Sequence, residues 1–96
     1  GYRKLLEASA GTIKKEIKLL CTGAVQAEVR DFFGTDAEYK MKDSGDLTVT
    51  AELPENGKFY GWLTGMGGSV RILKPKKSAA AYRDYLKSLA KDYKGL

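Results

Sequence analysis

The stretch AEYKMKDSGDLTVTAEL, residues 37–53, decides the fold, because it has the pattern of two strands joined by a tight turn. On each side of the turn apolar and polar residues alternate, as they do in strands with one buried face. Residues 43–46 have turn chemistry, and Gly45 can adopt a positive φ. We therefore expect a β-hairpin in the middle of the chain.

A helix and a strand are predicted on each side of this hairpin. Residues 16–21 alternate and residues 24–33 have helical spacing that ends at Gly34, whereas residues 58–66 are helical and residues 70–73 form a strand before Pro75. A long helix over residues 76–94 follows. The order β-α-β-β-α-β predicts an α+β, ferredoxin-like fold: a four-stranded antiparallel sheet with two helices on one face, plus a C-terminal helix.

Ninety-six residues are enough for one domain. We assign residues 15–96 to that domain and residues 1–14 to a linker or short helix that leads from a preceding domain. The periodicity predicts a core made of Ile17, Leu19, Val25, Val29, Phe32, Tyr39, Met41, Leu47, Val49, Ala51, Phe59, Trp62, Leu63, Val70 and Ile72.

The opposite, open face of the sheet is predicted to be basic and partly apolar. Its leucines suggest a partial cover, either the C-terminal helix or another chain. The alternation assigns to this face Lys18, Leu20, Lys40, Lys42, Thr48, Thr50, Arg71 and Leu73.

Composition excludes several function classes. The chain has no histidine and a single cysteine, Cys21, which excludes histidine-dependent catalysis and an intrachain disulfide. Cys21 itself is expected to be a small buried hydrophobe. We expect a non-enzymatic domain without metal or cofactor. No long apolar run or signal peptide is visible, so we expect a cytoplasmic protein without membrane contact.

The chain carries 17 basic and 12 acidic residues, and the second half holds the whole net charge of +5. Arg71, Lys74, Lys76 and Lys77, here called the basic corner, surround Pro75. Together with Lys18 they are candidate phosphate-binding residues, because guanidinium and ammonium groups hold phosphates without reading sequence. The alternative is a solvated turn, although two lysines at a helix N-terminus oppose its dipole.

Residues 61–75, GWLTGMGGSVRILKP, followed by a basic helix with Tyr93 near its end, resemble the C-terminal extension (WCX) domain of bacterial WYL-domain transcriptional regulators. The strand EIKLLC at residues 16–21, the sequence FFG ending at Gly34 and the hairpin centred on Gly45 match as well, so the resemblance covers about residues 15–94.

The resemblance implies a regulator that binds DNA through an N-terminal winged-helix domain, which lies outside this chain, followed by a WYL domain. It implies that the extension has a ferredoxin-like fold, helps the regulator to form a homodimer and contributes to effector binding. The effector is single-stranded DNA in some members. We therefore expect a C-terminal regulatory and dimerisation domain.

Other functions of the same fold are less well supported. An acylphosphatase-like enzyme needs an arginine in the loop after the first strand, and residues 22–25 supply none. An RNA-binding module stacks bases on aromatic side chains of its central strands, and residues 47–53 contain none. An allosteric domain that binds a small metabolite at a dimer interface stays open.

Overall fold

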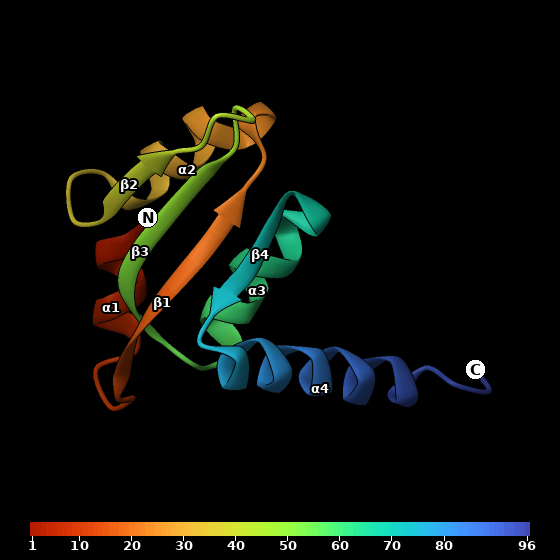
Figure 1. Ribbon diagram of the computed structural model, residues 1–96. Helices are drawn as coiled ribbons and strands as arrows, with labels where there is room; N and C mark the ends of the chain where they lie inside the picture. Colours follow the sequence, from red (N-terminus) through yellow and green to blue (C-terminus); the bar gives the residue numbers. More distant parts are fainter.

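Four strands form one antiparallel sheet in the computed structural model, which describes residues 1–96 (Figure 1). The order across the sheet is β2-β3-β1-β4, and each neighbouring pair is antiparallel. The predicted α+β class and four-stranded antiparallel sheet are thus confirmed. The strands are β1 (Lys14–Cys21), β2 (Glu38–Met41), β3 (Leu47–Pro54) and β4 (Val70–Lys74).

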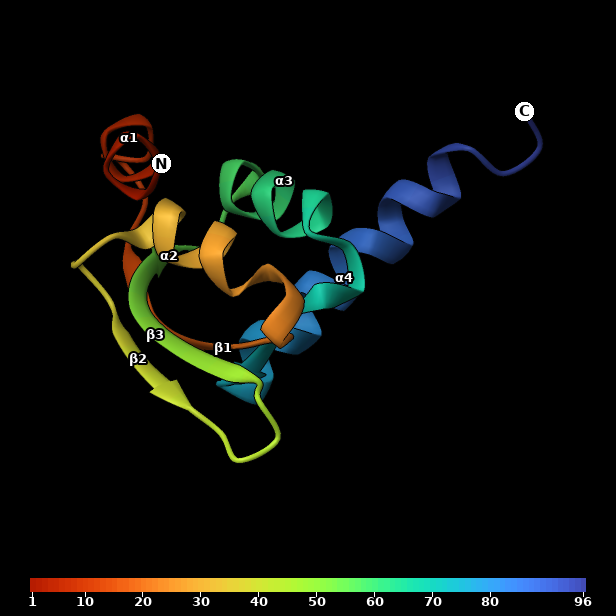
Figure 2. The same ribbon diagram turned by 90° about the horizontal axis from the view of Figure 1, so that it is seen from above.

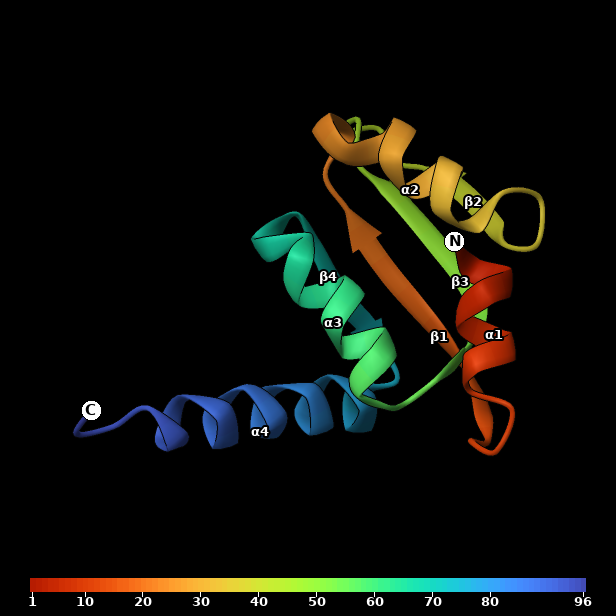
Figure 3. The same ribbon diagram turned by 180° about the vertical axis from the view of Figure 1, so that it is seen from behind.

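Three helices lie over one face of the sheet, and the fourth leaves from its edge (Figure 2). The three are α1 (Tyr2–Ala8), α2 (Gln26–Phe33) and α3 (Gly57–Gly65). The fourth, α4 (Lys76–Asp92), starts after β4 and projects beyond the sheet (Figure 3). Short 3-10 turns, Gly23–Val25 and Gly67–Ser69, precede α2 and β4. None of these helices is both long and apolar enough to cross a membrane.

The core lies between the sheet and the helices, largely as the periodicity predicts. Of the predicted core, Val25, Phe32, Tyr39, Trp62 and Ile72 are only half-buried and pack against its rim. The prediction for Met41 is wrong: it is 50% exposed, because it ends a four-residue edge strand that has a neighbour on one side only. The prediction omitted Tyr2, Leu5, Phe33, Leu53 and Tyr60, which are buried.

Helix α1 is packed against the rest of the domain. The Tyr2 hydroxyl donates to the backbone carbonyl of Glu52 (2.6 Å), and its ring lies 5.3 Å from that of Phe33. The side chain of Asn56 donates to the Ser9 hydroxyl just after α1 (2.9 Å). Residues expected to be a linker or short helix therefore form a helix that contributes to the core. That this segment leads from a preceding domain stays a prediction.

Helix α4 packs on the body of the domain through Tyr82 and Tyr85. Tyr82 and Tyr85 pack on Tyr60 of α3, with ring centroids 5.1 and 4.7 Å apart. The hydroxyls of Tyr82 and Thr64 lie 3.1 Å apart. The C-terminal helix thus contacts α3 of its own chain, while Leu73, predicted to be covered, stays 38% exposed.

Candidate functional site

A β-bulge in β4 decides which basic residues meet on the open face of the sheet. Leu20 pairs with Arg71 and Leu19 with Ile72, but Lys18 pairs with Lys74 rather than with Leu73. The extra residue in β4 shifts the following residues by one position. As a result Lys74 lies directly opposite Lys18, where a regular ladder would place a leucine.

The Lys18–Lys74 pair is electrostatically unfavourable as it stands. Like charges directly opposite each other on neighbouring strands are destabilising. Neither ammonium group lies within 4.0 Å of a carboxylate. The two lysines line a surface hollow of about 430 Å³ together with Glu16, Glu38, Thr50 and Pro75.

The remaining residues of the basic corner do not enter this hollow. Arg71 lies one row further along the open face, opposite Leu20, and lines a different cavity between β4 and α4. Lys76 and Lys77 are the first two residues of α4 and are exposed. The structure therefore brings Lys18 and Lys74 together with Arg71 nearby, and leaves Lys76 and Lys77 on the helix.

A carboxylate that the sequence pattern did not indicate lies at the N-terminus of α4. The Ser78 hydroxyl, which is buried, donates to Glu55 Oε1 (2.5 Å), and Lys15 Nζ lies 3.5 Å from the same oxygen. A carboxylate at a helix N-terminus is favourable. Glu55 thus offsets the effect of Lys76 and Lys77, and periodicity could not reveal it because residues 55 and 78 meet only in the tertiary structure.

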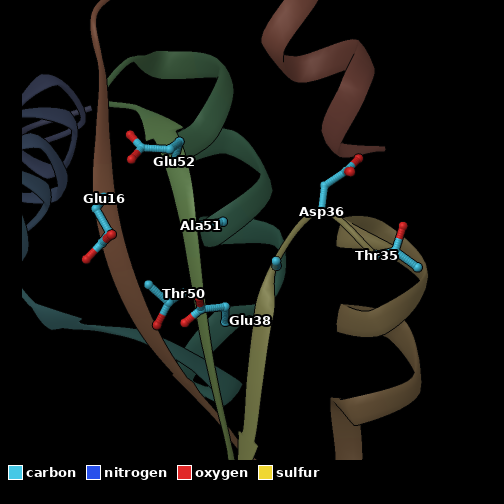
Figure 4. A pocket seen from close by; sticks show the side chains of 8 residues that line it. Glu16, Thr35, Asp36, Glu38, Thr50, Ala51 and Glu52 are labelled. Atoms are coloured by element: carbon cyan, nitrogen blue, oxygen red, sulfur yellow. The ribbon is translucent and has the colours of Figure 1, made fainter.

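An acidic hollow adjoins the hollow that Lys18 and Lys74 line, and Glu16, Glu38 and Thr50 belong to both. Glu16, Glu38 and Glu52 come from β1, β2 and β3, and Asp36 lies in the loop after α2 (Figure 4). Alternation alone could have assigned all three glutamates to this face, because each lies two residues from a position predicted there. The register adds that Glu38 pairs with Thr50. These carboxylates do not converge closely enough to hold a metal ion.

A family model described as the WCX domain matches residues 14–90, which runs from β1 through most of α4. The chain belongs to the WCX domain family. The resemblance noted in the sequence is therefore confirmed, and α1 lies outside the matched range. No curated protein matches the chain.

The mixed charge of the hollow limits what this WCX domain can bind there. Lys18 and Lys74 attract an anionic group, whereas Glu16 and Glu38 on the same lining repel one. A single phosphate between the two lysines keeps its negative charge away from the two glutamates. It therefore fits the lining better than a ligand that fills the hollow with negative charge. Arg71, further along the same face, can hold a neighbouring phosphate of an extended chain.

The thiol of the WCX domain's only cysteine is predicted to be unreactive. Cys21 is fully buried, and burial raises its pKa from 9.0 to about 11. The thiolate is the reactive form, so a pKa higher by about two lowers its fraction about 100-fold near neutral pH. We therefore expect iodoacetamide at about pH 8 to alkylate Cys21 at least about 100-fold more slowly in the folded chain than in urea. Mass spectrometry measures both rates.

The pH dependence checks the cause of this protection. The rate in the folded chain should keep rising between pH 9 and 11, because the thiolate forms only as the pH approaches the raised pKa. A folded-state rate that already levels off near pH 9 would contradict the burial effect.

Proposed function

We propose that this WCX domain is the C-terminal regulatory and dimerisation module of a WYL-type bacterial transcriptional regulator. The parent protein, in the cytoplasm, would form a homodimer and read DNA through a winged-helix domain outside this chain. Within it, Lys18 and Lys74 would contribute phosphate contacts to a single-stranded nucleic-acid effector, with Arg71 beside them. The domain would bind rather than catalyse, in keeping with a Cys21 thiol that stays protonated.

We also infer that the fold is ferredoxin-like. The chain order β-α-β-β-α-β from β1 to β4 supports this class, as does the placement of α2 and α3 on the same face of the sheet (Figure 2). Helix α1 would then be an addition on that face, and α4 an extension after the last strand.

The single observation that carries the nucleic-acid proposal is the bulge that sets Lys18 opposite Lys74 with no carboxylate within 4.0 Å of either. A phosphate between them would turn an unfavourable pair into two favourable contacts. Binding through such contacts releases counterions, so its affinity falls with salt concentration.

A binding experiment with matched variants tests the proposal. Fluorescence anisotropy of a labelled short single-stranded DNA is measured with the chain at two salt concentrations. For the double variant Lys18→Gln/Lys74→Gln we expect binding about tenfold weaker and a plot of log affinity against log salt that is less steep by about 1.4, for two lost contacts. The control Lys91→Gln/Lys94→Gln removes the same charge from the far end of α4.

Equal losses in the two double variants would show that only net charge matters and would overturn the assignment of Lys18 and Lys74. Absence of binding at low salt would also count against a phosphate site on this domain. Steep salt dependence that the control keeps and the test variant loses is the supporting result.

A small zwitterionic metabolite is the second candidate ligand. The observation that favours it is the presence of Glu16 and Glu38 in the same hollow as the two lysines, since an amino group and a carboxylate on one molecule would match both signs of charge. Titration with free amino acids while following the Thr50 amide by NMR would distinguish this candidate, because Thr50 also lines the hollow.

A further inference from the structure

Residues of β4, of α4 and of the segment between α3 and β4 line an apolar groove of about 440 Å³. Val70 and Ile72 line one wall, and Tyr82 and Leu86 of α4 line the other. Gly68 lies in the lining, and a Cβ placed there would meet no atom within 4 Å. The groove is therefore unfilled by the chain's own side chains.

The same groove continues into an uncovered stripe along the second half of α4. Leu86, Leu89 and Tyr93, spaced i, i+3 and i+7, are 37%, 41% and 74% exposed. Leu86 belongs to both the groove and the stripe, so they form one surface. We call Ile72, Tyr82, Leu86, Leu89 and Tyr93 the α4 surface.

An exposed surface of this kind is unusual for a chain that acts alone. Contiguous apolar patches bordered by polar residues mark interaction sites. The second half of α4 also projects away from the body (Figure 3), and a short helical segment without packing is marginal in water. A partner that covers Leu89 and Tyr93 would stabilise both the patch and the helix.

The border of the α4 surface is basic. Arg71 lines the groove, and Arg83, Lys87 and Lys94 follow one flank of α4, because residues spaced by four and seven share a side of a helix. The other flank offers one acidic residue near the stripe, Asp92. The border therefore matches a partner with negative charge beside its apolar residues.

We propose that the α4 surface docks an amphipathic helix of a partner protein, with apolar residues at i, i+3, i+4 and i+7 and glutamate or aspartate along its flank. One large apolar side chain of that helix enters the groove, and its acidic flank faces Arg71 and Lys87. A second copy of α4 fits less well. In an antiparallel pair of α4 helices, the basic flank of one helix would lie against the basic flank of the other. In a parallel pair, the basic flank would lie against the other flank, where the only acidic residue is Asp92.

A peptide pair tests both the surface and its charge. The probe is a labelled helical peptide of about 16 residues with a leucine stripe and glutamate flanks, and its counterpart has lysine at every flank position. Anisotropy with the full 96-residue chain should show binding of the acidic peptide, and binding of the lysine peptide weaker by at least about tenfold.

Matched variants locate the binding site. Gly68→Leu fills the groove from a position with free space, and Leu89→Lys removes an exposed apolar residue of the stripe; each should weaken the acidic peptide about tenfold or more. Met41→Lys is the control, because Met41 is 50% exposed on the opposite edge strand; it should leave binding unchanged. All three retain Lys18 and Lys74, so this test is independent of the DNA experiment.

Three results would overturn the proposal. Equal binding of the two peptides would show that the partner's negative charge does not contribute. A loss of binding in Met41→Lys as well would show that the peptide does not bind specifically at the α4 surface. Sedimentation velocity of the chain alone supplies the third: concentration-dependent self-association that Leu89→Lys abolishes would make a second copy the occupant of the surface.

Discussion

Phe59→Ala is expected to remove about 3–5 kcal/mol from the free energy of unfolding, a large share of the roughly 5–15 kcal/mol of a small domain. Phe59 is fully buried in α3, and its ring centroid lies 5.8 Å from that of Tyr60 and 6.5 Å from that of Trp62. Truncation at such a position loses the transfer free energy of the ring and leaves a cavity. Urea denaturation followed by the fluorescence of Trp62, the only tryptophan, measures the change.

Met41→Ala is the matched control, since the sequence pattern predicts both residues to be core and the structure exposes Met41 by half. We expect its effect to stay below about 1 kcal/mol. A Met41→Ala variant as unstable as Phe59→Ala would show that the end of β2 is covered in solution.

Asn56→Ala is expected to destabilise the domain by about 1.5–5 kcal/mol, because one side chain holds two elements. Asn56 Oδ1 accepts from the backbone N–H of Phe59 (3.0 Å) and caps α3, while Nδ2 donates to the Ser9 hydroxyl (2.9 Å). The loss of the cap accounts for about 0.5–2 kcal/mol, and the buried hydroxyl left without its donor for about 1–3 kcal/mol. Urea denaturation again measures the total.

Two further variants separate these contributions. Asn56→Asp keeps the capping oxygen, so it should recover the cap and protect the Phe59 amide from hydrogen exchange better than Asn56→Ala does. The loss of stability in the double variant Ser9→Ala/Asn56→Ala should be smaller than the sum of the losses in the two single variants. The reason is that each single variant already removes the hydrogen bond between Ser9 and Asn56. Strict additivity would mean that Ser9 and Asn56 are not coupled, and that the hydrogen bond between them does not help to hold α1.

The local elements follow closely from the sequence. The helix predicted over residues 58–66 is observed over Gly57–Gly65, and the strand predicted over residues 70–73 is Val70–Lys74. Glycine and proline mark these ends, and the apolar spacing differs clearly between helix and strand. The pattern was weakest at the edges of the fold, where Met41 is uncovered and α1 supplies Tyr2 and Leu5 to the core.

The candidate site was predictable only in part. Lys18 and Arg71 could be assigned to the open face from alternation, and both lie there. Lys74 joins Lys18 only because Leu73 is bulged, and a bulge has no reliable signature in a run of alternating residues. Glu38 pairs with Thr50 within the hairpin, and Thr50 pairs with Lys18. Glu38 therefore enters the same hollow as Lys18 only through the register of the hairpin against β1.

The sequence by itself determined the order and type of the elements, the family, the net charge and the identity of most core residues, because these depend on composition and on spacing between near neighbours. Only the tertiary structure decided that Lys74 meets Lys18, that Glu55 offsets the charge at the start of α4, and that Tyr82 and Tyr85 pack on Tyr60 while Leu89 stays uncovered. Each of these depends on strand register and helix docking between distant residues, which local periodicity does not specify.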